Sequence, residues 1–334
     1  MQAWEDAQHV ERVLMVARED RERPLPIAAL AILGIIPRGR GCMWWIYKNL
    51  VLLAELGLMA GVVWSAVKVR DDRSLYFHVT VACIGFGAVI GAICLRIMRI
   101  NDLLGPNERP IEFYAASFGF LDSWHILSTR IFVIVLLFWF CAVLSHTIMN
   151  LYFECDVAGE PSLKACSFNI AVMGMLCGVF YLKLHICVGL EQAVDHYCMR
   201  VFQAQELDNF VTEWNVLQAM LRRAAHVIES CFFSVGTGVL GVVVLTSVEL
   251  LNRFGEGGPE SKSLTRLTVK DGFCLALWPG WIGPPMGLVL FFVFRAAAIT
   301  EKCNRVPALV NSWMTTDRNI DLEKQYVVQY IMHS

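Results

Sequence analysis

Charged residues are scarce in this sequence, and their scarcity excludes most soluble folds. They make up 17% of the 334 residues, whereas hydrophobic residues make up 56%. The mean hydropathy is positive, which a water-soluble domain with one core rarely needs. The net charge is only −2, and no basic stripe alternates with aromatic residues, so nucleic acid is not an expected partner. The composition predicts an all-α polytopic membrane protein whose first partner is the lipid bilayer.

The motifs of common enzymes and cofactor proteins are also missing. No Ser/His/Asp or Cys/His set, phosphate-binding loop or pair of carboxylates at catalytic spacing stands out. Twelve cysteines are present, but most lie in apolar runs without CxxC spacing, where thiols act as small hydrophobic groups. His185-x-Cys187 and His196-x-Cys198 offer four zinc ligands, yet residues two apart on a helix point away from each other. We therefore expect no enzyme, no cofactor and no metal.

The apolar runs predict a membrane helix bundle of six spans joined by short loops. The predicted spans are Asn49–Val67, Tyr76–Leu95, Ile131–Leu151, Phe168–Leu190, Cys231–Leu251 and Phe273–Ala298. No repeat or linker interrupts them, so we treat residues 1–334 as one membrane domain. Its parts are an N-terminal segment 1–48, spans one to four in 49–190, a helical layer 191–230, spans five and six in 231–298, and a tail 299–334.

The N-terminal segment is expected to lie in the cytoplasm. It lacks the apolar core of a signal peptide and carries several arginines, whereas the loop Tyr152–Ser167 has a single lysine. Positive charge marks the cytoplasmic side, although the cations of Asn252–Lys270 would then face outward. Val10 to Ala17 is typical of a short amphipathic helix, and Ile27–Ile36 is half the ~20 residues that a span needs. We expect a plasma membrane protein with a cytoplasmic N-terminus.

A few polar residues fall within the predicted spans or at their ends. A charged Glu55 would cost at least ~2.5 kcal/mol to insert into the membrane. Its side chain is therefore either neutral and hydrogen-bonded inside the bundle, or it lines a water-filled path. Lys183 is expected to extend its long side chain to the membrane interface. Cys155 and Cys166 flank an outward loop, where they either form a disulfide or stay free.

The region Glu191–Ser230 is polar but has apolar residues at helical spacing. This pattern predicts two amphipathic helices that continue spans four and five into the cytoplasm. Their apolar stripes need partners, so we expect a homo- or hetero-oligomer formed through these helices. The pairs Gly87/Gly91 and Gly174/Gly178 predict close helix packing, within the chain first and between chains second.

The last span contains Trp278-Pro279-Gly280-Trp281-Ile282-Gly283-Pro284-Pro285. Each proline lacks a backbone donor and disfavours helix in the residue before it, so we predict a break here and a helix end at Pro307. A break at membrane depth survives only inside protein or beside a wet cavity. It is thus either a ligand pocket or hinge, or a feature of the outer surface. The ligand or gating candidates are Glu55, Trp278, Pro279, Trp281 and Pro284.

The chain resembles the seven-helix chemoreceptor superfamily of insect gustatory and odorant receptors and their protist and plant relatives. The resemblance rests on the expected cytoplasmic N-terminus and on the long cytoplasmic extensions expected for the fourth, fifth and sixth spans. It also rests on Ala298-Ile299-Thr300-Glu301-Lys302 followed by Glu323-Lys324-Gln325-Tyr326. It implies a small-molecule ligand and a ligand-gated cation channel, tetrameric through its cytoplasmic helices. The family's pore is lined by a seventh helix, which would begin where this chain ends at Ser334. We therefore expect this chain alone not to conduct through that pore.

Three functions are compatible with these features. A gustatory receptor-like channel subunit is the first. A secondary transporter that uses Glu55 and the broken last span is the second, because discontinuous helices often hold transporter substrates. The third is a non-conducting scaffold that binds partners through Glu191–Ser230 and the tail.

Overall fold

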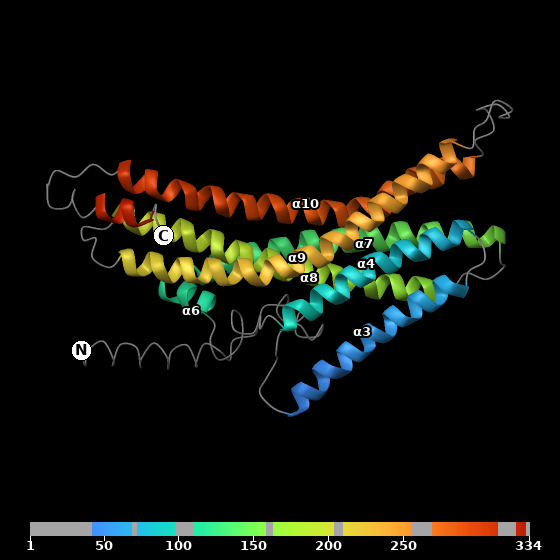
Figure 1. The fold of residues 1–334 in the computed structure, drawn as a ribbon, viewed down its shortest axis with the longest axis horizontal. Helices are drawn as coiled ribbons and strands as arrows, with labels where there is room; N and C mark the ends of the chain where they lie inside the picture. The colour runs from blue at the N-terminus through green and yellow to red at the C-terminus, as the bar shows by residue number, and fades with distance from the viewer. Residues whose placement is uncertain are drawn as a thin grey trace.

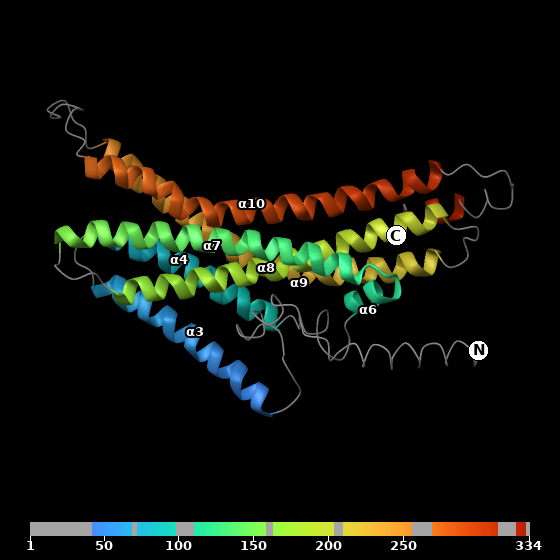
Figure 2. The same cartoon turned by 180° about the vertical axis from the view of Figure 1, so that it is seen from behind.

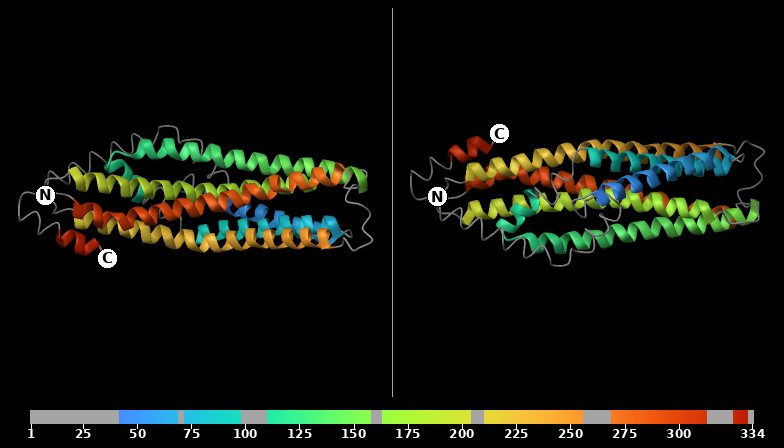
Figure 3. Two further views of the ribbon diagram at one scale, coloured as in Figure 1. Left: turned by 90° about the horizontal axis from the view of Figure 1, so that it is seen from above. Right: turned by 90° about the horizontal axis from the view of Figure 1, so that it is seen from below.

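The computed structural model describes residues 42–68, 72–97, 110–157, 163–203, 210–255, 269–312 and 325–331. This part of the chain is all α-helix apart from the turn at residues 118–120, which confirms the predicted fold class. The helices are α3 (Cys42–Lys68), α4 (Asp72–Ile97), α6 (Pro110–Ser117), α7 (Leu121–Val157), α8 (Leu163–Gln203), α9 (Phe210–Gly255) and α10 (Val269–Ser312), followed by a short helix over residues 325–331. The long helices run side by side along one axis (Figures 1 and 3).

Helix α8 lies at the centre of the bundle. Helices α3, α4, α7, α9 and α10 all pack against it, and Figures 1 and 2 show α3 and α10 on opposite sides. Its apolar stretch Asn169–Val201 is 83% buried, compared with 22% to 29% for those of α7, α9 and α10. The outer helices instead expose large apolar side chains, which a bilayer covers.

Each predicted span lies within one of the described helices. Helices α7, α8, α9 and α10 are long and apolar enough to cross a membrane, and α3 and α4 contain the shorter apolar stretches Asn49–Gly61 and Val79–Leu95. The protein is therefore integral to the membrane. Most helices are longer than the spans predicted within them, because polar residues continue the helix beyond the apolar run.

The predicted helical layer forms one end of the bundle. Helix α8 continues to Gln203 and α9 begins at Phe210, where an ion pair of 2.9 Å joins Arg200 to Glu213. The helix at 325–331 lies at the same end, and the Tyr330 hydroxyl donates to Asn215 at 2.8 Å. This confirms that Glu191–Ser230 continues spans four and five as helices.

Helix α6 was not expected from the sequence, although its caps are visible there. Pro110 supplies the fixed φ of a first helical residue and Glu112 places negative charge in the first turn. Gly119 ends the helix with φ 76°, and the amides of Gly119 and Phe120 donate to Ala116 and Ala115 at 3.2 and 3.0 Å. This is the Schellman pattern, which needs a residue that tolerates positive φ.

The predicted break in the last span is wrong. Helix α10 is continuous from Val269 to Ser312 and passes through Pro279, Pro284, Pro285 and Pro307. A proline removes one hydrogen bond and crowds the preceding turn, but the other bonds of the helix remain. In a membrane each further unsatisfied backbone group would cost more than the strain. The helix therefore bends instead of breaking, as Figures 1 and 2 show.

Some predictions fall outside the described residues. The N-terminal stripe from Val10 to Ala17 and the short run Ile27–Ile36 are among them. The backbones of Cys155 and Cys166 lie in α7 and α8, but their side chains are outside the described part. The disulfide between them stays a prediction.

The glycine pair on α4 packs inside the chain, against α9. A Cβ on Gly87 would lie 3.2 Å from the Cα of Gly238, and one on Gly238 would lie 2.7 Å from the carbonyl oxygen of Cys83. A Cβ on Gly91 would meet Val235 and Cys231 of α9. Small residues thus let the two backbones touch, as expected for helices in lipid.

Gly238→Ala should destabilise the protein, because the added methyl group overlaps backbone that cannot rotate away. We expect a loss of about 1–3 kcal/mol, measured by thermal unfolding in lipid nanodiscs. Gly236→Ala is the matched control, since a Cβ there meets nothing within 4 Å and alanine favours helix by about 0.5–1 kcal/mol. Equal unfolding temperatures for the two variants would contradict the close packing.

Candidate functional site

Four side chains at intervals of four residues form a polar stripe along α8. They are Lys183, Cys187, Glu191 and Asp195. Residues four apart lie on the same face of a helix, and this face turns toward α10, as the contacts of Lys183, Glu191 and Asp195 show. We call it the α8 stripe.

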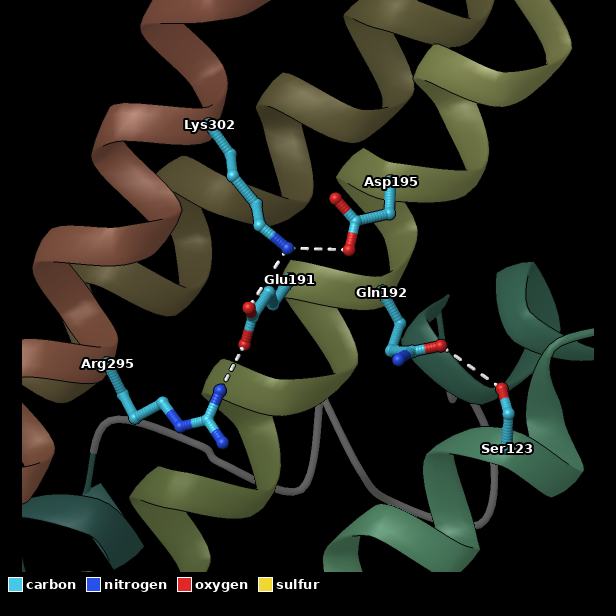
Figure 4. Close-up of polar contacts among 6 residues, drawn as sticks. All are labelled: Ser123, Glu191, Gln192, Asp195, Arg295 and Lys302. Carbon is cyan, nitrogen blue, oxygen red and sulfur yellow. Dashed lines mark hydrogen bonds and ion pairs between the residues drawn. The ribbon is translucent and has the colours of Figure 1, made fainter.

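At the C-terminal end of the α8 stripe, Glu191 and Asp195 form a cluster of ion pairs with α10 (Figure 4). Arg295 lies 2.9 Å from one carboxylate oxygen of Glu191, and Lys302 lies 2.9 Å from the other. Lys302 also contacts Asp195 at 2.6 Å. The Glu191 side chain is only 14% exposed, so these pairs are less screened than surface pairs. They fix α10 against α8 at two positions two turns apart.

Lys183 lies at the N-terminal end of the α8 stripe, and its side chain does not reach the membrane interface. Its side chain is fully buried, and Nζ lies 5.2, 5.7 and 5.3 Å from the ring centroids of Phe180, Phe232 and Phe292. The prediction that it extends to the membrane surface is therefore wrong. A lysine side chain can extend to the membrane interface only from a helix with one exposed face. Around Lys183, α8 is buried on all faces.

A second polar group of α8 faces α7. The Ser128 hydroxyl lies 2.7 Å from the Tyr181 hydroxyl and 2.6 Å from Nδ1 of His185. Trp124 donates its indole N–H to the His185 carbonyl at 3.0 Å and stacks on the imidazole. All four side chains are buried. Sequence reasoning missed Ser128 and Tyr181, although the spacing of Tyr181 and His185 is a visible signal of a shared helix face.

This group is buried between α7 and α8 and joins the two helices. A serine beside a histidine has the form of a nucleophile and its base, but Tyr181 occupies the other side of the Ser128 hydroxyl. Trp124 covers the imidazole of His185, which is 2% exposed. The network satisfies buried polar groups, which would otherwise cost stability.

The structure separates several of the predicted site residues. Glu55 is buried on α3 and Pro284 is buried on α10. These two helices lie on opposite sides of the bundle (Figure 1). Trp278, Pro279 and Trp281 lie in α10, but their side chains are outside the described part. The role of these five residues in ligand binding or gating stays a prediction.

The two histidine-cysteine pairs are also separate. His185 bonds to Ser128, whereas His196 stacks on Phe120 with ring centroids 4.7 Å apart. Within the described ranges, no group of three or more His, Cys, Asp and Glu side chains is placed to hold a metal ion.

Solved structures share this arrangement of helices. The structure of the insect olfactory receptor OR5 from Machilis hrabei aligns with a TM-score of 0.61 and 10% identity, covering 91% of this chain and 88% of that chain. The chain has the fold of an insect olfactory receptor. The same receptor in complex with eugenol aligns with a TM-score of 0.53 and 11% identity, covering 92% and 88%. No family model and no curated protein matches the sequence.

The olfactory receptor fold confirms the resemblance at the level of architecture. At 10% identity the local sequence carries little of it, whereas the order and length of the helices carry most. The protein is thus a chemoreceptor-like membrane protein by fold. In it the α8 stripe joins the central helix to the last long helix.

Removing the carboxylate of Glu191 should loosen this junction. In Glu191→Ala, Arg295 and Lys302 lose a shared and partly buried acceptor, so we expect a loss of about 1–3 kcal/mol in unfolding free energy. Glu301→Ala is the control, because Glu301 is exposed and pairs with Arg305 on the same helix; it should change stability by less than about 1 kcal/mol. Thermal unfolding in nanodiscs measures both, and an equal change in both would contradict the role of the cluster.

Proposed function

We propose that the protein is a gustatory receptor-like chemosensory protein that binds a small apolar molecule and acts as a subunit of a ligand-gated cation channel. The observation that carries this proposal is the olfactory receptor fold over 91% of the chain. That one such receptor was solved with eugenol supports a small aromatic or apolar ligand. We propose no enzymatic activity.

The ligand is proposed to act on α10. This helix packs on α7 and α8, and its prolines bend it, so it has two segments that can tilt separately. Pro284 is buried near Gly287, where a Cβ would lie 3.0 Å from the Phe138 ring of α7. Trp278, Pro279, Trp281 and Glu55 stay our other ligand or gating candidates.

The ion pairs of the α8 stripe are proposed to set how readily α10 moves. We place the end of the bundle that holds them in the cytoplasm of the plasma membrane, in keeping with the arginines of the N-terminal segment. In the receptor family that the sequence resembles, the segment after the sixth span leads to the pore. A ligand that displaces α10 must therefore strain the contacts of Arg295 and Lys302 with Glu191.

Ligand binding is testable on the purified chain in nanodiscs. Eugenol and related apolar volatiles should raise the unfolding temperature in a saturable way, because a ligand that binds only the folded state stabilises it by about 2.7 kcal/mol at 100 times its Kd. Glucose serves as the polar control and should have no effect. Cation currents in cells that express the chain, alone and with candidate partner subunits, provide the second readout. A panel of apolar volatiles without any saturable shift or evoked current would overturn the proposal.

We also propose that the helical layer associates with further subunits. Outside the bilayer an exposed apolar side chain needs a partner surface. The helical layer exposes Met199 and Val216, and the neighbouring ends of the chain expose Leu309 of α10 and Tyr326 of the helix at 325–331. A half-open groove of about 670 Å³ lies between α9, α10 and the helix at 325–331, and its described lining residues are all uncharged. These features equally suit a scaffold that binds partners without conducting, which the current measurements separate from a channel subunit.

Leu309→Asp should weaken subunit association, because it places a charge in an apolar contact. Thr300→Asp is the control: it is also exposed on α10, and nine residues at 3.6 per turn place it on the opposite face. Mass photometry in nanodiscs or detergent should show smaller particles for Leu309→Asp alone. Unchanged particle mass in both variants would exclude this face of α10 from the interface.

The transporter alternative loses its main argument. It requires a discontinuous helix to hold the substrate, but α10 is continuous. Glu55 also lies on α3, across the bundle from α10.

A further inference from the structure

Three helices enclose the ammonium group of Lys183 with aromatic rings. Phe180 comes from α8 itself, Phe232 from α9 and Phe292 from α10, all with centroids within 5.7 Å of Nζ. Ring faces attract a cation, but they do not replace the water or the counter-charge that a buried ammonium loses. This cage is an unusual surrounding for a side chain that lies in the middle of an apolar helix.

The charges of the α8 stripe balance without Lys183. Glu191 and Asp195 are matched by Arg295 and Lys302 in direct contacts. Among the residues that the structure describes, no oxygen or nitrogen acceptor is placed for Nζ of Lys183. The thiol of Cys231 lies within hydrogen-bonding reach but is only a weak acceptor. Aromatic faces attract the charge but leave the strong N–H donors without an oxygen acceptor. A buried ammonium in this state is complementary to an anion.

The seam between α9 and α10 is where Lys183 is separated from the bilayer by the fewest helix contacts. Both helices pack on α8, and within the described ranges they touch each other at few positions. Across this seam the rings of Phe232 and Phe292 meet with centroids 5.5 Å apart. Phe233 and Phe294 stand mostly exposed on the outer sides of the same two helices. Rotating the Phe232 and Phe292 rings apart would therefore open Lys183 toward lipid.

We propose that Lys183 binds the carboxylate of an apolar carboxylic acid that arrives from the bilayer between α9 and α10. This inference rests on the proposed chemosensory function and names a ligand class for it. The carboxylate would accept the N–H groups that lack an oxygen partner and neutralise the buried charge. The apolar tail would lie between the phenylalanine rings. A neutral alcohol of the same length would leave the charge uncompensated.

The test compares octanoate, octanol and octylammonium on the unchanged chain in nanodiscs of zwitterionic lipid. Thermal stability and tryptophan fluorescence report binding. Octanoate should bind about ten- to hundredfold more tightly than octanol, which is the range of one hydrogen-bonded charge, and octylammonium should not bind saturably. Because this comparison needs no variant, it is independent of any folding defect. Equal affinities for octanoate and octanol would overturn the proposal.

Two variants then locate the site. Lys183→Met should fold at least as well as the parent chain without ligand, because it removes an unpaired buried charge, and should lose the preference for octanoate over octanol. Lys183→Arg keeps the cation and should retain the preference. Preserved octanoate binding in Lys183→Met would place the ligand elsewhere and overturn the assignment.

Two further comparisons are informative. The first identifies the source of the acid, and the second separates the Lys183 site from the proposed chemosensory function. Competition by palmitate points to membrane fatty acids, and its absence points to short soluble acids; both results support the carboxylate site. If eugenol stabilises the chain but octanoate does not, the Lys183 proposal fails and the chemosensory function stands. If octanoate binds but no ligand evokes a current with any partner, the site stands and the channel role fails.

Discussion

The central constraint on this structure is that α8 has no side open to lipid or water at mid-length. Every residue from Met175 to Leu190 is buried, so each polar group in this stretch has to be accommodated by a neighbouring helix. Helix α7 provides the Ser128 hydroxyl and the Trp124 indole, and α9 and α10 provide rings around Lys183. The outer helices are arranged around what α8 carries.

The sequence predicts the helices well because apolar length and helical spacing are local properties. The long spans follow from the length of each apolar run, and the extension of α8 and α9 follows from apolar residues at helical spacing. Both can be recognised within a single segment. The prolines of α10 show the limit of such rules. The strain of Pro284 and Pro285 is local, but the cost of breaking a helix inside a membrane depends on what surrounds it. Helix α6 is short, so its caps at Pro110 and Gly119 had to be recognised without support from an apolar run.

The candidate site is less predictable because its partners are far apart in the chain. Lys183 and His185 are conspicuous in an apolar segment, yet Phe292 and Ser128, which decide their surroundings, come from other helices. The choice between an interfacial and a buried lysine depends on whether its helix is central or peripheral. Hydropathy does not distinguish these positions, since α8 is no more apolar than α9 or α10. The ion pairs of Glu191 likewise require the relative register of two helices.

The contact of Gly87 with Gly238 has a mechanical consequence. Two backbones that touch cannot slide or roll past each other without a clash, so we expect α4 and α9 to move as one rigid unit. Helices α7 and α10 pack together on the other flank of α8. The bundle therefore consists of two helix pairs, α4 with α9 and α7 with α10, that both pack on α8. In the described part of the chain, the contact between the two pairs is sparse where α9 meets α10. A displacement at one end of such a pair would therefore move its other end as well.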